Sequence, residues 1–304
     1  DLHLCDRRQR QMCIRDRQQV EAGGSSIGAV VSGRGRQKVW GTAEQTSVQK
    51  GGIVDVMEGG SVRETAVSGG ELVVNPDAFS YNTQMSSGTL SVFGTDTDSI
   101  ISGGVQQVES GGIALNSQVR SGGVQSVFSG GKAENTTIDK GGWLFLFSGG
   151  SLAGTTKVTE GVVTVVGSNN ISDMQLQNAA VNIPFSHDFS TLQFDSLNGN
   201  GLFGINSSLS EGLSDKILVH SGTGNFGLII HDYSPDGNIP AKFKIIDEDS
   251  GAADSFYLVG DAVDVGAFRY GLRQEGDDWV LVRSQDVSDS AVIAKNTCLL
   301  YTSD

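Results

Sequence analysis

Hydrophobic residues of this chain fall into short groups that recur at a fixed distance and are separated by pairs of glycines. Three consecutive segments from Gly103 read GGVQQVESGGIALNSQVRS, GGVQSVFSGGKAENTTIDK and GGWLFLFSGGSLAGTTKVT, so that equivalent positions lie 19 residues apart. Such sets include Val105, Val124 and Trp143, then Val108, Val127 and Leu146, and then Ser110, Ser129 and Ser148. The chain therefore contains an internal repeat, which decides the fold class before any single motif does.

The repeat predicts stacked coils of β-strands. A unit this short cannot bury a hydrophobic face alone, so equivalent positions must stack around a shared core. The repeats are rich in Val, Ile, Thr and Ser, and glycine pairs interrupt them too often for a helix to propagate. We expect an all-β fold, a right-handed parallel β-helix (solenoid) of roughly 18–19-residue coils. Its interior should receive Val105, Val124 and Val127.

The glycine pairs predict the corners of this solenoid. From Gly51 to Gly69, and again from Gly103 to Gly150, they alternate between separations of eight residues and of ten or eleven. A corner requires positive φ or close approach to the next coil, and glycine allows both. We expect aligned corners at Gly111, Gly112, Gly130 and Gly131. At about 4.8 Å per coil, roughly ten coils would form a rod about 50 Å long.

Composition divides the chain into four segments. Residues 20–191 carry the Gly-Gly repeats, with a degenerate stretch and a modified corner loop around Asn75, and residues 192–284 are richer in aromatic and charged residues. We expect residues 1–19 to be a foreign or disordered N-terminal arm, and residues 285–304 a linker and foreign tail. The ends of both resemble translated sequencing adapters, and we leave these segments out of the fold prediction.

Charge and cysteine content narrow the class of protein. The net charge is −14, which argues against nucleic acid as a partner, because nucleic-acid binding requires clustered Lys and Arg. All three cysteines, Cys5, Cys13 and Cys298, lie near the ends. Stability should therefore come from stacked coils rather than from a disulfide framework.

Two glycine motifs invite enzymatic readings that their context does not favour. Gly199 to Gly204 fits G-x-G-x-x-G, but the residues that follow predict no helix to complete a dinucleotide site. Gly24 to Gly28 fits G-x-S-x-G, but no α/β sheet is predicted to hold such a nucleophile. We therefore expect no cofactor.

Two further motifs suggest a cation or a sugar. The acidic runs at Asp96 and Asp98 and at Asp247–Asp249 lack the spacing of known calcium loops, so we expect solvated turns. Trp143 occupies the repeat position of Val105 and Val124. We expect its ring in the core or stacked between coils rather than on a sugar-binding platform.

Catalysis on a polysaccharide would need acidic residues that converge from neighbouring coils. The repeat supplies no such row, since Phe128 stands 19 residues after Glu109, and Asp139 lies between Arg120 and Val158 at this spacing. A non-enzymatic protein is favoured. A polysaccharide-binding or polysaccharide-degrading β-helix enzyme stays the alternative.

The C-terminal segment resembles the autochaperone region that ends the passenger of pertactin-like autotransporters. Its motifs L-x-G-x-G-x-F, s-D-K-L-x-V, V-D-x-G-x-[FY]-x-Y-x-L and W-x-L all have counterparts. The matching residues are Leu197, Gly199, Gly201, Phe203, Asp215, Lys216, Asp264, Gly266, Phe268, Tyr270, Trp279 and Leu281. The repeats before this segment are similar to those of the AIDA-like adhesins (adhesin involved in diffuse adherence).

This resemblance implies a cell-surface passenger of a Gram-negative bacterium, exported by type V secretion through an outer-membrane β-barrel of the same parent polypeptide. The C-terminal region would cap the solenoid and promote folding after export. The passenger would mediate adhesion to a host or abiotic surface, or self-association of cells in aggregates and biofilm. For the adhesive surface we predict a repeated polar ladder of Ser110, Ser129, Ser148, Asn116 and Asn135, whose weak contacts add up by repetition.

Overall fold

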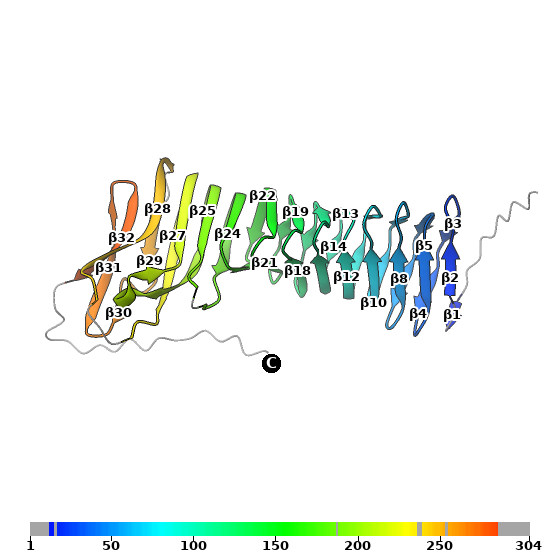
Figure 1. Ribbon diagram of the computed structural model, residues 1–304, viewed down its shortest axis with the longest axis horizontal. Coiled ribbons are helices and arrows are strands. Elements are labelled where there is room, and N and C mark those ends of the chain that lie inside the picture. The colour runs from blue at the N-terminus through cyan, green and yellow to red at the C-terminus, as the bar shows by residue number, and fades with distance from the viewer. Residues whose placement is uncertain (1–11, 15–16, 187, 236–238, 253–254, 285–304) are drawn as a thin grey trace, which may run out of the picture.

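The computed structural model describes residues 12–14, 17–186, 188–235, 239–252 and 255–284, which form a rod of stacked β-coils (Figure 1). Each coil contributes strands to three stacks, which we call faces A, B and C. Within each stack, neighbouring strands pair in parallel. The all-β solenoid expected from the repeat is confirmed. Residues 1–11 and 285–304 lie outside the described residues.

Face A contains the strands that carry most of the Val-rich repeat positions. Its strands are β2 (Arg17–Val20), β5 (Arg36–Val39), β8 (Ile53–Val56), the second halves of β10 (Ala66–Val74) and β12 (Gln84–Val92), β15 (Gly104–Val108), β18 (Gly123–Val127), β21 (Trp143–Phe147) and β23 (Val162–Val166). The pairing of β15 with β18 keeps the 19-residue register, with Gly104 opposite Gly123 and Val108 opposite Val127.

Faces B and C consist of shorter strands. Face B contains β3 (Ser25–Ile27), β6 (Thr42–Glu44), β9 (Ser61–Arg63), β11 (Phe79–Tyr81), β13 (Thr95–Thr97), β16 (Ile113–Leu115), β19 (Lys132–Glu134) and the start of β22 (Ser151–Thr159). Face C contains β1 (Met12–Ile14), β4 (Val30–Ser32), β7 (Ser47–Gln49), the first halves of β10 and β12, β14 (Ile100–Ile101), β17 (Gln118–Val119) and β20 (Thr137–Ile138).

The core lies inside the rod and is built from one inward row on each face. On face A a fully buried row of Val39, Val56, Val74, Val92, Val108, Val127, Leu146 and Val165 passes from coil to coil. Because successive side chains of a strand point to opposite sides, this row fixes which residues of each strand face outward.

The inward position of Val127 is confirmed, but the predictions for Val105 and Val124 were wrong. Both valines are half-buried on the outer side of face A, and Gln106 and Gln125 take the interior positions beside them. Val108 and Val127 are fixed inside, so the residues three positions earlier must point outward. The same rule places Trp143 outside, with 41% of its surface exposed, so the core position expected for it was also wrong.

The predicted glycine corners are confirmed. Gly111 and Gly130 have φ of 82° and 78°, and the Gly111 amide donates to the Gly130 carbonyl at 2.9 Å. A Cβ atom at Gly112 would lie 2.0 Å from the Val92 carbonyl oxygen, so only glycine fits beneath the preceding coil. In the modified loop, the Ala78 backbone amide donates a hydrogen bond to the Asn75 backbone carbonyl.

The third corner of each coil uses a polar residue with positive φ in place of a glycine pair. It is followed by a buried Ser or Thr. The polar residues of this row are Gln45, Glu64, Asn82, Asp98, Asn116 and Asn135. Two glycine corners and one polar corner per coil explain why the Gly-Gly separations alternate.

Coil stacking crosses both predicted segment boundaries. At the N-terminal end, β1 and β2 pair in parallel with the next coil, although β1 and all of β2 except Val20 belong to the segment 1–19. At position 192 the strands only become longer: β24 (Asn169–Asn182), β25 (Thr191–Ser208) and β27 (Lys216–Asp232) each bend around all three faces and pair in parallel. The change in composition therefore marks a change in coil size.

The C-terminal end of the rod is closed by antiparallel strands (Figure 1). β28 (Lys242–Ala252) pairs in parallel with β27 on one edge and antiparallel with β32 (Asp278–Ser284) on the other. β31 (Phe268–Glu275) then pairs with β32 and with β30 (Val263–Val265). The short elements η1 (Leu209–Glu211), β26 (Leu213–Ser214) and β29 (Ser255–Leu258) complete this end. Among the described residues no helix is long and apolar enough to cross a membrane.

Candidate functional site

The predicted serine ladder lies at the corner between faces A and B. Ser110, Ser129 and Ser148 are all exposed, one per coil. Each lies beside the glycine of the following coil: a Cβ at Gly130 would lie 2.6 Å from the Ser110 Oγ, and one at Gly149 would lie 2.6 Å from the Ser129 Oγ. The serine row therefore presents evenly spaced hydroxyl groups over a glycine surface.

The predicted asparagines lie elsewhere, at the polar corner between faces B and C. Asn116 and Asn135 are exposed and both have φ of 55°. The Asn116 amide donates to the Asp98 carboxylate at 3.0 Å, and the Asn135 side-chain oxygen accepts from the Thr155 backbone amide at 3.2 Å. These amides hold neighbouring coils together. Because they lie at a different corner from the serines, the expected five-residue ladder divides into two separate rows.

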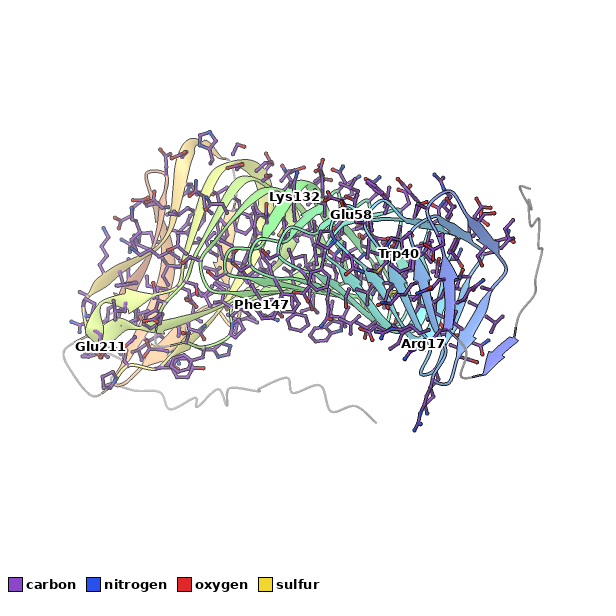
Figure 2. The ribbon with its side chains drawn as sticks, turned by 45° about the vertical axis from the view of Figure 1, so that its right-hand side comes forward. Arg17, Trp40, Glu58, Lys132, Phe147 and Glu211 are labelled. Atoms are coloured by element: carbon purple, nitrogen blue, oxygen red, sulfur yellow. The ribbon has the colours of Figure 1, made fainter. Side chains whose placement is uncertain are left out.

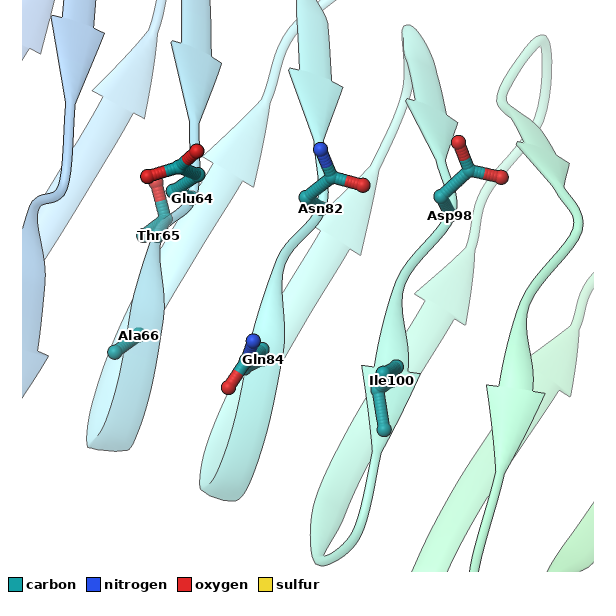
Figure 3. Close-up of a pocket in the computed structure, with 7 residues that line it drawn as sticks. All are labelled: Glu64, Thr65, Ala66, Asn82, Gln84, Asp98 and Ile100. Carbon is teal, nitrogen blue, oxygen red and sulfur yellow. The ribbon is translucent and has the colours of Figure 1, made fainter.

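A shallow groove follows the same polar corner (Figure 3). The side chains of Glu64, Asn82 and Asp98 project from three consecutive coils along one rim, and Ala66, Gln84 and Ile100 line the other. It offers carboxylate and amide groups in a row. Among the residues that the structure describes, no group of three or more His, Cys, Asp or Glu side chains is arranged to hold a metal ion.

The sequence-based expectation of a solvated turn at Asp96 was wrong. Asp96 is fully buried on the inner side of β13, where its carboxylate accepts hydrogen bonds from the Ser80 hydroxyl and, at 2.6 Å, from the Gln106 amide. Burial, the largest cause, raises the pKa of Asp96 from 3.8 to about 6, although the hydrogen bonds from Ser80 and Gln106 act against it.

Asp96 begins a buried chain of hydrogen bonds along the rod. The Gln125 amide donates to the Gln106 side-chain oxygen at 2.7 Å, and the Thr136 hydroxyl donates to the Gln125 oxygen at 3.2 Å. Burying these polar groups is tolerated because each one finds a partner. The polar positions inside the Val-rich strands could have been found from the sequence by fixing the inward row first.

The apolar residues of the predicted autochaperone motif form the core of the C-terminal coils. Leu197, Phe203, Tyr270 and Leu281 are fully buried, and the Tyr270 hydroxyl donates to the Pro240 carbonyl at 2.7 Å. A row of aromatic contacts runs along the interior through Phe194, Phe203, Phe226, Phe256 and Trp279, with ring centroids 5.5 to 6.0 Å apart.

The motif glycines lie where a strand turns against the coil below. Gly199 has φ of 100°, and a Cβ there would lie 2.0 Å from the Leu176 carbonyl oxygen. A Cβ at Gly201 would lie 2.7 Å from the Ala179 oxygen. Gly266 has φ of 57° in the turn between β30 and β31. Gly199 and Gly266 favour glycine because their φ angles are positive, and Gly201 favours glycine because a Cβ would contact the backbone of the coil below.

Asp215 is the most highly connected polar residue of the motif. It is buried, and its carboxylate accepts from the Ser190 amide at 2.7 Å, the Asn206 amide at 2.8 Å and the Asn206 side chain at 2.8 Å. It therefore fixes the start of β25 to its far end. Its neighbour Lys216 is exposed at the start of β27.

The remaining motif residues join the closing strands. Arg269 donates to Asp264 through two nitrogens at 2.7 and 2.9 Å, and this ion pair lowers the pKa of Asp264. Phe268 packs beneath the Arg283 guanidinium, which lies 4.1 Å from its ring centroid. Phe268 is partly buried against the core.

Trp279 completes the motif by contacting the second acidic run. Its indole donates to the Glu248 carboxylate at 2.9 Å. Glu248 is buried in β28, and this burial raises its pKa, so the solvated turn expected for Asp247–Asp249 was wrong at this residue.

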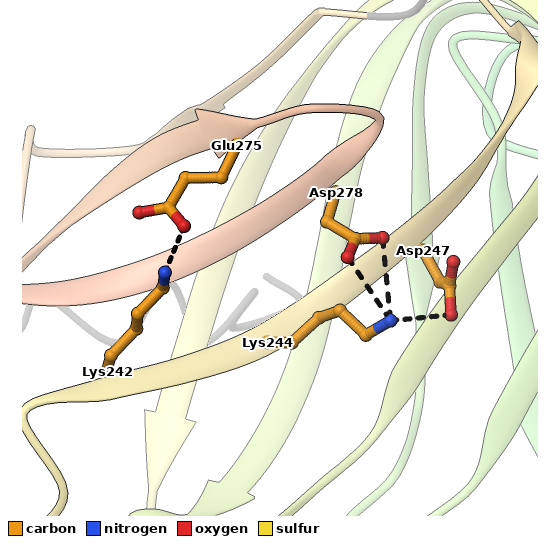
Figure 4. A network of polar contacts seen from close by, with 5 residues as sticks. All are labelled: Lys242, Lys244, Asp247, Glu275 and Asp278. Atoms are coloured by element: carbon orange, nitrogen blue, oxygen red, sulfur yellow. Dashed lines mark hydrogen bonds and ion pairs between the residues drawn. The ribbon is translucent and has the colours of Figure 1, made fainter.

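Exposed ion pairs connect the same strands (Figure 4). Lys242 contacts Glu275, and Lys244 lies between Asp247 at 2.9 Å and Asp278 at 3.3 Å. The hydrogen bond that the Lys244 ammonium donates to Asp247 lowers the pKa of Asp247. The pair with Asp278 joins β28 to β32 and the pair with Glu275 joins β28 to β31. Exposed pairs of this kind add little stability.

Two families match separate parts of the chain. Residues 107–161 match the family described as adhesin of bacterial autotransporter system, probable stalk, and residues 170–283 match the family described as pertactin. These segments cover the repeats and the C-terminal coils, respectively. The predicted resemblance to autotransporter passengers is thereby confirmed.

Curated relatives include immunoglobulin A1 protease autotransporters of Haemophilus influenzae. One is 32% identical over 120 residues and another 30% identical over 118 residues. Each alignment covers 36% of this chain but only 7% or 8% of the relative. The chain thus corresponds to a small part of these much longer proteins.

Among solved structures, a hyper-glycosylated fragment of TibA, modified by TibC, is similar with a TM-score of 0.56 and 21% identity. The alignment covers 79% of this chain and 94% of that fragment. At this level of identity the similarity concerns the fold.

Proposed function

From the presence of autotransporter stalk repeats joined to a pertactin-type end region, we propose that this chain is part of a non-enzymatic adhesive passenger on the surface of a Gram-negative cell. Passengers of these families are exported to the cell surface. The passenger attaches cells to a host or abiotic surface or to one another. Its parent polypeptide supplies the outer-membrane β-barrel through which it is exported.

The serine row carries this proposal. Ser110, Ser129 and Ser148 repeat one exposed hydroxyl at the spacing of the coils, about 4.8 Å. One hydrogen bond to a hydroxyl adds little affinity, but many identical contacts made together by a rigid body add avidity. The rod keeps these hydroxyls in line because the backbone of each corner is hydrogen-bonded to the next coil, from the Gly111 amide to the Gly130 carbonyl and from the Gly130 amide to the Gly149 carbonyl.

The C-terminal coils have a second role, in folding. Their aromatic row lies in the interior of the rod, and Asp215 ties both ends of β25 together. Such a segment can fold early and present an edge on which the smaller coils add one by one. The closing strands also cover an edge that would otherwise template aggregation.

The adhesive role is tested by placing negative charges along the serine row. Cells that display the passenger from its intact parent should settle or bind a surface less when Ser110→Glu, Ser129→Glu and Ser148→Glu are combined, because repelling hydrated charges replace hydroxyls. The matched control combines Ser102→Glu, Ser121→Glu and Thr137→Glu on face C and its corner with face A. It should settle normally.

The enzyme alternative predicts a different outcome. A polysaccharide-degrading β-helix would release reducing or unsaturated sugar ends and would be insensitive to the serine variants. Sugar release together with unchanged settling of the triple variant would contradict the adhesin proposal.

A further inference from the structure

The outer side of face A carries two straight rows of uncharged residues from β12 to the C-terminal coils. Register pairing defines the first row as Thr89, Val105, Val124, Trp143, Val162, Ala180, Leu202, Gly227 and Tyr257. The second row contains Ser91, Gln107, Ser126, Phe145, Thr164, Asn182, Gly204, Ile229 and Val259. We call the two rows together the apolar stripe.

The absence of charge in these rows distinguishes them from the rest of the surface. None of the residues in the apolar stripe is charged, although the whole chain has a net charge of −14. The earlier coils of the same face carry Arg36, Lys38, Asp55 and Glu71 at the equivalent outward positions. The change from charged to apolar occurs along one continuous sheet, so the fold does not require it.

Large side chains on the stripe are open to solvent. Trp143 is 41% exposed, Leu202 38% and Tyr257 46%. Leu202 and Tyr257 reach over Gly227, where a Cβ would meet them at 2.6 and 3.0 Å. Trp143 lies beside Phe145 with ring centroids 6.3 Å apart.

Aromatic rings also border the stripe. Phe128 and Phe147 stack at 4.8 Å along the edge that leads to the serine row. In Figure 2, Phe147 lies on the lower side of the rod, away from Lys132 on its upper edge. Uncharged polar residues lie between these hydrophobic side chains, and two of them, Ser91 and Ser126, are buried. The stripe thus brings exposed aromatic and aliphatic side chains from several coils onto one uncharged face, which indicates a binding surface.

We propose that the apolar stripe is the surface through which two copies of this chain pair. This inference rests on the proposed function and names the partner in self-association as an identical rod. The stripe is a sheet face, and two sheet faces pack well at about 10 Å with strands within about 30° of each other. A second copy supplies the same uncharged surface, with exposed aromatic and aliphatic side chains among uncharged polar ones.

Charge selects this face among those available for pairing. Two rods with a net charge of −14 each repel when acidic surfaces meet. On the stripe no like charges are brought together, and no charge must lose its water. A neutral glycan fits less well, because Val105, Val124 and Val162 are aliphatic and the Phe128 and Phe147 rings face each other.

The area of the stripe is sufficient for a weak or moderate dimer. Eight coil steps at about 4.8 Å give a length of about 40 Å, and two outward rows with their aromatic border give a width of about 15 Å. The product, on the order of 600 Å², approaches the roughly 800 Å² per partner of standard interfaces. Trp143 lies near the middle of this area, where aromatic residues contribute most.

The test measures the oligomeric state of the purified chain by sedimentation equilibrium. We expect a dimer that persists when NaCl is raised from 50 to 500 mM, because the buried surface carries no ion pairs. Trp143→Asp with Phe145→Asp should raise the dimer Kd at least about thirty-fold. Gln118→Asp with Thr137→Asp on face C should leave it unchanged, and far-UV circular dichroism should match for all variants.

A monomer at all concentrations, or a dimer that the stripe variants leave intact, would overturn this inference. Either result leaves the proposed adhesion standing if displayed cells still settle and the serine variants still reduce settling. A monomer that binds a neutral polysaccharide, and loses this binding with the Trp143 and Phe145 variants, would assign the stripe to a glycan instead and so also overturn the pairing.

Discussion

At the scale of single residues, Asp96 shows how a carboxylate inside the solenoid makes stability depend on pH. Its pKa in the folded chain is about 6, against 3.8 for the ordinary side chain. A raised carboxyl pKa means that the fold favours the protonated form. Stability from this group is therefore highest below pH 3.8, declines as the pH rises towards 6, and stays at its lower level above that.

Asp96→Asn should stabilise the chain at neutral pH. The neutral amide avoids the cost of a buried charge, and the amides of Gln106 and Gln125 and the Thr136 hydroxyl can reverse their hydrogen bonds to suit it. The shift of the pKa corresponds to about 2 to 3 kcal/mol at pH 7 and to no gain at pH 3.5. Denaturant unfolding across this range measures the effect.

Asp96→Ala is the control for this prediction. It also removes the charge but leaves the Ser80 hydroxyl and the Gln106 amide without their partner, so it should stabilise less than Asp96→Asn. Two results would contradict the assignment of Asp96 as a buried carboxylate whose charge lowers stability. One is an Asp96→Asn chain that is less stable than the parent at pH 7, and the other is a gain in stability that is the same at every pH.

At the scale of the strand, alternation decides what a substitution does. Val124 and Val127 lie in the same strand, β18, but Val127 is fully buried and Val124 is on the outer side. Val127→Asp should prevent folding or destabilise the chain by about 4 kcal/mol or more, because a carboxylate would enter the core. Val124→Asp should cost less than about 1 kcal/mol. Thermal unfolding of the two variants compares them directly.

Equal destabilisation by the two aspartates would show that the strand does not alternate in this way.

Sequence reasoning identified both valines as repeat positions, but periodicity alone could not say which of them faced inward. The group GVQQV has valines three positions apart, whereas a strand changes sides at each residue. One of the two had to lie outside, and the buried row shared with Val108 decided it.

At the scale of the whole molecule, stability should depend on the C-terminal coils. Removing residues 192–284 exposes the edge of β24, whose backbone groups now pair with β25 over nearly their whole length. We expect the shortened passenger to be degraded by added protease on the cell surface, or to aggregate when purified. The full passenger, treated in parallel, should resist the same protease.

Unchanged protease resistance of the shortened passenger would contradict this dependence. A further comparison keeps the chain at full length and combines Lys242→Ala with Lys244→Ala, which removes the two lysines at the start of β28. These exposed ion pairs should matter little, so loss of resistance only on truncation would assign the effect to the core and the covered edge.

The sequence by itself determined the fold class, the spacing of the coils and the glycine corners. Each depends on short-range chemistry repeated many times: glycine at Gly111 and Gly112 for a tight corner, and β-branched residues between corners. The C-terminal motif was equally readable, because apolar residues such as Leu197 and Phe203 have one role, to fill the core.

Only the tertiary structure decided which side of a strand each residue occupies and which residues meet. It placed Asp96 inside and Trp143 outside, separated the serine row from the asparagine row, and aligned the uncharged outer positions of face A into one stripe. The physical reason is that a repeat fixes the distance between equivalent positions along the chain, whereas burial is a property of the whole coil. Within a coil, the side that faces inward is set jointly by all three strands and by the coils stacked above and below.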